Sequence, residues 1–145
     1  MQSDEQDLKE IARRYVEAAW NEADVDTMED VLTEQQVYHD PTGSGEEPLS
    51  EFKSFILGYH ETFPDLHFEV DRYIQEDDYV AFWGQVTGTH EGPFMGIEPT
   101  GETIDIMGIN VVRVKDGKVA ERWANFDLFG ILQQIGHDPL GRAEP

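Results

Sequence analysis

The sequence predicts an α+β fold in which helices come first and an antiparallel sheet follows. Three observations support this prediction. Apolar residues recur at helical spacing before residue 64, they alternate with polar residues from residue 66 onward, and Asp116-Gly117 separates two long apolar segments as a hairpin turn does. Helices followed by a run of strands are typical of α+β proteins.

Three helices are expected in the first half of the chain. The first covers residues 4–22, where the apolar residues fall on one helical face. The second is short and covers residues 26–32, with Asp26 as its cap. The third begins after Pro48 and ends at Pro64, because proline cannot continue a helix.

Five strands are expected, and the last four follow one another as an antiparallel meander. The segment after Pro41 is rich in turn residues, so no strand is expected there. Gly84, Gly88 and Gly108 lie inside strands and indicate bulges or bends that curl the sheet. The expected strands cover residues 36–40, 66–74, 79–90, 102–114 and 118–127, and a last helix covers residues 128–135.

Length and composition indicate one domain. The chain has 145 residues, of which 39 % are hydrophobic, enough for a single core. We expect the domain to span residues 1–136 and residues 137–145 to form a polar tail. The absence of cysteine excludes disulfides and thiolate metal sites. No apolar run approaches the ~20 residues of a membrane span, and no signal peptide is recognisable, so a cytoplasmic location is expected.

The charge of the chain limits its partners. There are 31 acidic residues against 10 basic ones, a formal net charge of -21. Nucleic acids and anionic membranes need a basic surface, so both are excluded as partners. The acidic residues are scattered along the chain, which is typical of an acidic surface that keeps a halophilic protein soluble in high salt.

Two motifs near the C-terminus carry a family resemblance. Gly88 to Gly101 follows the pattern GTHxGxFxGxxPTG, and Glu121 to Gly136 follows ExWxxxDxxGxxxQxG. Both resemble the SnoaL-like polyketide cyclases of the nuclear transport factor 2-like superfamily. The resemblance implies a cone-shaped, curved antiparallel sheet packed against three to four helices, with a pocket for a small molecule, no cofactor, and a homodimer.

A second resemblance, to the ketosteroid isomerases, points to catalytic residues. It rests on Arg14-Tyr15-Val16 and on the segment from Val37 to Ser44, in which Asp40 precedes a proline. By this resemblance Asp40 would take a proton from the carbon beside a carbonyl, and Tyr15 would bind the enolate oxygen. The second oxygen donor falls on Asn110, whose amide can donate at every pH. Other interpretations stay open, since Asp40 also suits a turn and Tyr15 a helix core.

The chain departs from the cyclases at their catalytic positions. The aspartate expected on the last strand is Ala124 here, and the assisting histidine on the preceding strand is Asn110. Asp127 remains as a second acid, although a carboxylate before a helix also serves as a cap. Arg122 is expected at the surface, paired with Glu121 or Asp105.

The pocket is expected to be lined by aromatic, histidine and acidic side chains from several elements. No histidine spacing supports a metal site, so none is predicted. His90 has the alternative of bonding the backbone of its own loop. The expected lining residues are Trp20, His39, Trp83, His90, Met107, Trp123, Phe126 and Asp127.

Three functional hypotheses follow from these patterns. The first is an isomerase or cyclase that transfers a proton next to the carbonyl of a small apolar or cyclic compound. The second is a dimer that binds a ligand without catalysis or serves a structural role, because one fold hosts many functions. The third is an epoxide or ester hydrolase in which Asp127 and Arg122 activate a water.

Overall fold

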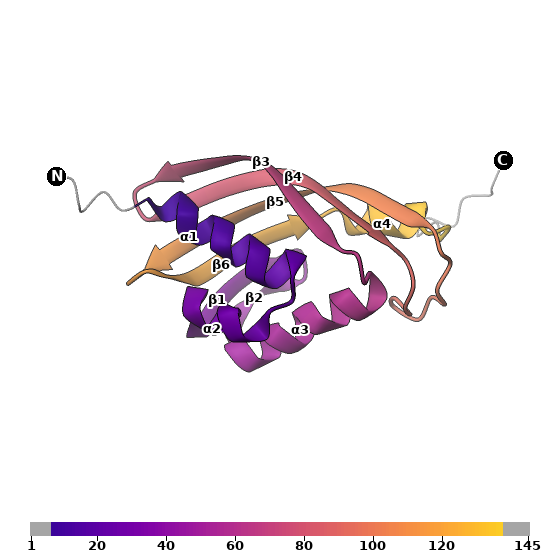
Figure 1. Ribbon diagram of the computed structural model, residues 1–145, viewed down its shortest axis with the longest axis horizontal. Helices are drawn as coiled ribbons and strands as arrows, with labels where there is room; N and C mark the ends of the chain where they lie inside the picture. The colour runs from indigo at the N-terminus through magenta and orange to yellow at the C-terminus, as the bar shows by residue number, and fades with distance from the viewer. Residues whose placement is uncertain (1–6, 138–145) are drawn as a thin grey trace.

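Six strands form one curved sheet, and helices cover its concave side (Figure 1). The computed structural model describes residues 7–137, and within this range the strand order is β2-β1-β6-β5-β4-β3. The helices are α1 (Leu8–Tyr15), the π-helix η1 (Val16–Asn21), α2 (Val25–Val31), α3 (Leu49–Thr62) and α4 (Leu128–Gln134). The strands are β1 (Leu32–Asp40), β2 (Gly43–Pro48), β3 (His67–Glu76), β4 (Tyr79–Thr89), β5 (Thr103–Lys115) and β6 (Lys118–Phe126).

The predicted α+β class and curved sheet are confirmed. Helices α1, α2 and α3 lie on one side of the sheet, and α4 lies at the end where β4 and β5 are joined (Figure 1). Within the described residues no helix is both long and apolar enough to cross a membrane. The expected polar tail lies outside the described residues, apart from His137.

Strand β2 was not expected from the sequence, and it extends the sheet by one strand. It pairs antiparallel with β1 from Gln35–Pro48 to Asp40–Gly43. Its residues are polar, glycine or proline, so no apolar alternation marks it as a strand. The other difference is that β1 pairs with β6 in parallel, so the sheet is mostly rather than wholly antiparallel.

The first helix ends differently from the expected single α-helix. The amide of Glu22 bonds to the carbonyl of Glu17 at 2.9 Å, the five-residue spacing of a π-helix. This wider turn places Trp20 on the same side of the helix as Tyr15, five residues earlier. The indole N–H of Trp20 therefore reaches the Tyr15 hydroxyl. The next helix is capped by Asp24 rather than by the expected Asp26, because the Asp24 side chain accepts the Thr27 amide.

Two of the strand glycines shape the sheet. A Cβ atom at Gly84 would lie 1.9 Å from the Glu69 carbonyl oxygen, and the β3–β4 register shifts between Val70 and Arg72 at this point. The predicted bulge is therefore present. A Cβ atom at Gly108 would lie 2.5 Å from the Phe126 ring. This glycine lets that ring lie inside the curve of the sheet.

Candidate functional site

One row of side chains crosses the inner face of the sheet and contains two of the residues expected to be catalytic. Asn110 of β5 pairs with Ala124 of β6. On the other side of β6, His39 of β1 pairs with Trp123. Because β1 and β6 run in parallel, the next residues along them, Asp40 and Ala124, therefore lie beside each other. Neighbouring strands are about 4.8 Å apart, so the Asp40 and Asn110 backbones are about 10 Å apart, with only the Ala124 methyl group between them.

Asn110 presents a buried amide nitrogen that has no hydrogen-bond partner among the described residues. Its exposed fraction is 3 %, whereas that of the preceding residue, Ile109, is 50 %. Among residues 7–137 nothing accepts a hydrogen bond from the Asn110 Nδ2. A buried donor left unpaired costs about 1–3 kcal/mol. An inward amide with this cost is suited to donate to the oxygen of a bound molecule.

Asp40 lies at the rim of the interior, where β1 ends. Its side chain is exposed, and Oδ1 accepts hydrogen bonds from the Thr42 amide at 2.8 Å and the Thr42 hydroxyl at 2.5 Å. No described residue donates to Oδ2. Burial, with an added contribution from the Asp40 charge, raises the pKa of Tyr59 on α3. The turn therefore holds the Oδ1 of Asp40, within the electrostatic reach of Tyr59, and leaves Oδ2 without a donor among the described residues.

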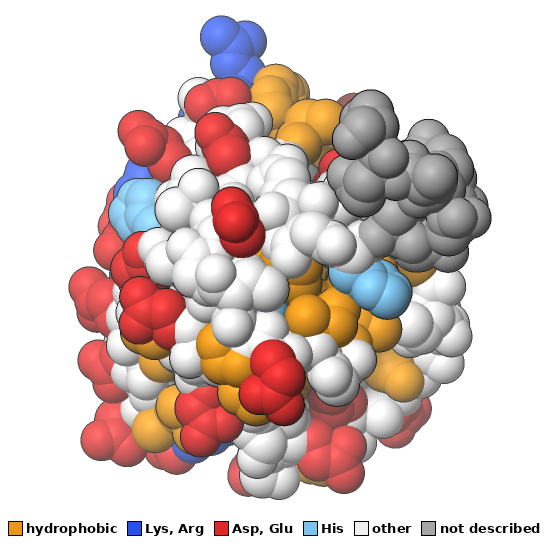
Figure 2. Space-filling model, turned by 90° about the vertical axis from the view of Figure 1, so that its right-hand side faces the viewer, with side chains coloured by type: hydrophobic (Ala, Val, Ile, Leu, Met, Phe, Trp, Pro, Cys, Tyr) orange, Lys and Arg blue, Asp and Glu red, His pale blue; other side chains and the backbone are white. Residues whose placement is uncertain are grey.

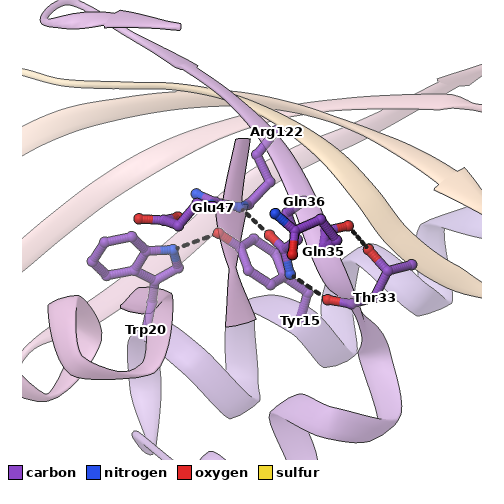
Figure 3. A network of polar contacts seen from close by, with 7 residues as sticks. All are labelled: Tyr15, Trp20, Thr33, Gln35, Gln36, Glu47 and Arg122. Carbon is purple, nitrogen blue, oxygen red and sulfur yellow. Dashed lines mark hydrogen bonds and ion pairs between the residues drawn. The ribbon is translucent and has the colours of Figure 1, made fainter. Parts of the chain in front are cut away.

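Tyr15 belongs to a buried polar cluster beneath the sheet (Figure 3). Its hydroxyl oxygen accepts a hydrogen bond from Trp20 Nε1 at 3.1 Å. The Arg122 guanidinium lies beside this oxygen and donates to Gln36 and Glu47, both at 2.7 Å. Burial raises the pKa of Tyr15 more than Arg122 and Trp20 lower it. Tyr15 therefore keeps its proton at neutral pH and can donate it in a hydrogen bond.

The expectation that Arg122 lies at the surface and pairs with Glu121 or Asp105 is wrong. Arg122 is 7 % exposed, and its guanidinium carbon lies 3.7 Å from the centre of the Phe52 ring. The reason is the alternation of side chains along β6. Ala124 stands at the position of the catalytic aspartate of the cyclases, and a residue two positions earlier shares its face of the strand. This spacing was the signal in the sequence that could have placed Arg122 inside.

Trp20 fills the interior above Ala124. Its indole N–H reaches Tyr15 beside Arg122, and its ring meets the edge of Phe126 at 4.8 Å between centroids. Arg122 and Phe126 flank Ala124 at two-residue spacing on β6, so the indole spans the Ala124 position. The cavity left at this end of the interior is about 10 Å³, room for about one water molecule. Trp20 and Phe126 thus line the interior.

Four of the expected lining residues lie on the other side of the sheet, here called the outer face. Met107 is 57 % exposed and precedes the buried Gly108, while His39 stacks on Trp123 at 4.7 Å. Side chains alternate along a strand, so these positions cannot line the interior. His39 and Trp123 instead line an open groove of about 440 Å³ on the outer face. The four residues are His39, Trp83, Met107 and Trp123.

His90 is fully buried, and its hydrogen bonds hold the loop between β4 and β5 in place. Its Nδ1 accepts the Thr100 amide at 3.2 Å and lies 2.9 Å from the Thr100 hydroxyl, so the expected loop role is confirmed. Its Nε2 has no partner among the described residues. Across residues 7–137 no three His, Asp or Glu side chains gather as a metal site requires.

Asp127 caps α4. Its Oδ1 accepts the Gly130 amide at 2.8 Å, as expected for a carboxylate before a helix. Arg122 is bonded elsewhere, to Gln36 and Glu47. Within residues 7–137 no hydrogen bond or ion pair joins Asp127 to Arg122, so their contacts do not support a hydrolase that activates water with both.

An apolar groove lies where α3, the β4–β5 loop and α4 meet, at the end of the molecule seen in Figure 2. Hydrophobic side chains gather in the hollowed centre of this face, with acidic side chains around them. The groove has a volume of about 380 Å³ and no charged side chain lines it. Its wall residues Phe55 and Tyr59 also contact Trp20, which connects the groove to the interior. The groove suits an uncharged molecule.

A curved sheet that wraps around helices, with polar side chains on its inner face, is the cone-shaped architecture of the nuclear transport factor 2-like proteins. The family model of the SnoaL-like polyketide cyclases matches residues 9–135. The chain therefore belongs to the SnoaL-like polyketide cyclase family. No curated protein matches the sequence significantly.

Solved structures agree with this assignment. IdmH from Streptomyces antibioticus, a proposed polyketide cyclase, shares 26% identity over 90% of this chain and 99% of its own, with a TM-score of 0.81. AclR from Streptomyces galilaeus, a proposed hydroxylase, shares 31% identity over 94% and 83% of the two chains, with a TM-score of 0.79. A proposed SnoaL-like cyclase from Jannaschia sp. CCS1, at 24% identity over 90% and 92%, has the same fold with a TM-score of 0.81.

Proposed function

We propose that the protein transfers a proton at the carbon next to the carbonyl group of a small, uncharged, apolar or cyclic compound. The observation that carries this proposal is the Asn110 amide nitrogen, which is buried, points into the interior and has no hydrogen-bond partner among the described residues. Two further features support it. Asp40 lies in the same row across the sheet, and Tyr15 holds a protonated hydroxyl in the same interior.

The proposed chemistry assigns one step to each group. The free Oδ2 of Asp40 takes the proton from the α-carbon, and the electrons of the broken C–H bond move toward the carbonyl oxygen. Asn110 and Tyr15 donate hydrogen bonds to that oxygen as it becomes negative, which lowers the barrier. Return of the proton from Asp40 to another carbon gives an isomer. Alternatively, the enolate carbon bonds to the carbon of a second carbonyl group, and the alkoxide formed there takes the proton from Asp40, which gives a ring. No cofactor takes part.

Binding of a ligand in the interior requires the Trp20 side chain to move. Its indole occupies the space above Ala124, where a ligand would meet Asp40 and Asn110. The apolar groove at the end of the molecule borders Trp20 through Phe55 and Tyr59. The ligand enters from this groove and takes the place of the indole.

Deuterium exchange tests the proposal. The cyclic ketone 2-tetralone is incubated with the protein in D₂O, and loss of its α-proton signals is followed by proton NMR. The protein should accelerate exchange above the rate given by the same concentration of unfolded protein, which carries the same carboxylates. Binding of 2-tetralone without faster exchange would favour the alternative of a non-catalytic binding protein.

The outer face supports a homodimer. Several large apolar side chains are exposed there and surround the aromatic stack of His39 on Trp123. Exposed apolar patches of this kind are typical of interfaces between proteins. The exposed members are Ile74, Tyr79, Met107 and Ile109.

Substitution at the outer face tests the dimer. Ile109→Asp places a charge in the patch, so the mass measured by sedimentation equilibrium should fall from that of a dimer to that of a monomer. Leu57→Asp is the matched control: Leu57 is 47 % exposed against 50 % for Ile109, but it lies on α3. A wild-type protein that is already monomeric would contradict the proposal.

The environment of the protein is proposed from its charge. A net charge of -21 supports a halophilic source, where salt screens the repulsion between carboxylates on an acidic surface. A cytoplasmic location remains a prediction from the sequence.

A further inference from the structure

The oxygen of Tyr15 has a hydrogen-bond donor and a positive charge beside it. Trp20 Nε1 donates to it at 3.1 Å, and the Arg122 guanidinium lies beside the same hydroxyl (Figure 3). A phenolic oxygen has two lone pairs and one proton. The positive charge repels the hydroxyl proton and turns it away from Arg122. Among the described residues nothing accepts a hydrogen bond from Tyr15, so its proton is available to a ligand.

Arg122 is fixed more firmly than Trp20. Its Nε donates to Gln36 and a terminal nitrogen donates to Glu47, both at 2.7 Å. The guanidinium carbon also lies over the Phe52 ring, 3.7 Å from its centre, and the Phe52 ring stacks on Tyr15 at 6.3 Å between centroids. A planar guanidinium held by two hydrogen bonds and an aromatic face has one orientation. When a ligand displaces Trp20, Arg122 stays in place.

We propose that Arg122 is a positioning residue for Tyr15. By placing its positive charge beside the Tyr15 oxygen, it turns the hydroxyl proton toward the interior and makes the phenol a stronger donor to the ligand's carbonyl oxygen. This inference rests on the proposed function. It adds a residue that no family motif supplied, together with the Glu47 carboxylate from the edge strand β2 that anchors it.

The charges around Tyr15 agree with this arrangement. Burial raises the pKa of Tyr15, the Arg122 charge lowers it, and the Glu47 charge raises it. Removal of the two side chains should therefore have opposite effects. Loss of Arg122 leaves the phenol less acidic, whereas loss of the Glu47 charge alone leaves Arg122 unneutralised and makes the phenol more acidic.

Fluorine NMR can follow this acidity directly. The five tyrosines are replaced biosynthetically by 3-fluorotyrosine, a more acidic phenol, and the Tyr15 resonance is assigned with Tyr15→Phe. In Arg122→Met/Glu47→Gln the Tyr15 resonance should titrate at higher pH than in the wild type. In Glu47→Gln alone it should titrate at lower pH. The measurement needs no substrate, so its failure is distinct from failure of the proposed catalysis.

The chain offers a matched control. Arg113 and Glu121 form another arginine–glutamate pair between strands, at 2.9 Å, but away from Tyr15. Arg113→Met/Glu121→Gln changes the same charges and should leave the Tyr15 titration where it was. An unchanged Tyr15 midpoint in both Arg122→Met/Glu47→Gln and Glu47→Gln would overturn the proposal. So would an equal shift in the control. Should the double variant not fold, the downward shift in Glu47→Gln decides the question alone.

Discussion

Asp40→Asn should slow the exchange of the α-protons of 2-tetralone by about 10²- to 10⁴-fold, the usual contribution of a positioned general base. An amide has nearly the shape of the carboxylate and can still accept from Thr42, so the turn after β1 is kept. The substituted side chain cannot take a proton. The rate is measured by proton NMR in D₂O at saturating ketone, so that a change in binding does not enter the comparison.

The control for Asp40 is another aspartate held by a threonine. Asp65, in the turn between α3 and β3, accepts the amide and the hydroxyl of Thr89 at 2.7 and 2.8 Å. Asp65→Asn removes the same charge and should leave the exchange rate at its wild-type value. Equal rates for wild type and Asp40→Asn would remove Asp40 from the mechanism and leave the interior as a binding site.

Arg122→Met should lower the free energy of unfolding by roughly 3 kcal/mol, because removal of one partner leaves the other charge uncompensated. Glu47 is the partner, and its side chain is 21% exposed, which places the cost near the lower end of the usual range. The contact of Arg122 with Phe52 is lost as well. Urea unfolding followed by circular dichroism gives the value.

Two further variants separate the contribution of the ion pair to the free energy of unfolding from the contribution of packing. Arg122→Met/Glu47→Gln should regain most of the lost stability, since neutral side chains often replace a buried pair without cost. Arg113→Met breaks the more exposed pair with Glu121 and should cost no more than about 1 kcal/mol. A single Arg122→Met variant as stable as Arg113→Met would mean that the guanidinium does not support the fold.

The fold was predictable because its signals are local. The helical spacing before residue 64, the alternation after residue 66 and the Asp116-Gly117 turn all correspond to elements of the structure. Strand β2 was missed because backbone pairing alone defines it, and its polar residues carry no apolar alternation. The π-helix was missed because its geometry depends on how Trp20 packs against Tyr59 and Phe126.

The site was harder to predict, because one residue of register decides which side chains face inward. Hydrophobicity favours Trp123 inside and Arg122 outside, and the structure has the reverse. Asn110 was placed inward from its family position, and the structure buries it. Whether Asp40 acts as a base depends on its Thr42 turn and its place beside Ala124, neither of which sequence spacing determines.

The carbon-13 shift of a bound ketone tests the central claim, which is that Asn110 and Tyr15 donate to the ligand's carbonyl oxygen. 2-Tetralone labelled at its carbonyl carbon is added to the wild type and to Asn110→Leu, which keeps the size of the side chain and removes the donor. We predict that the carbonyl signal of the ketone bound to the wild type moves downfield from its position in water, and that the shift becomes smaller in Asn110→Leu. A bound ketone with the same carbonyl shift in both proteins would contradict the account.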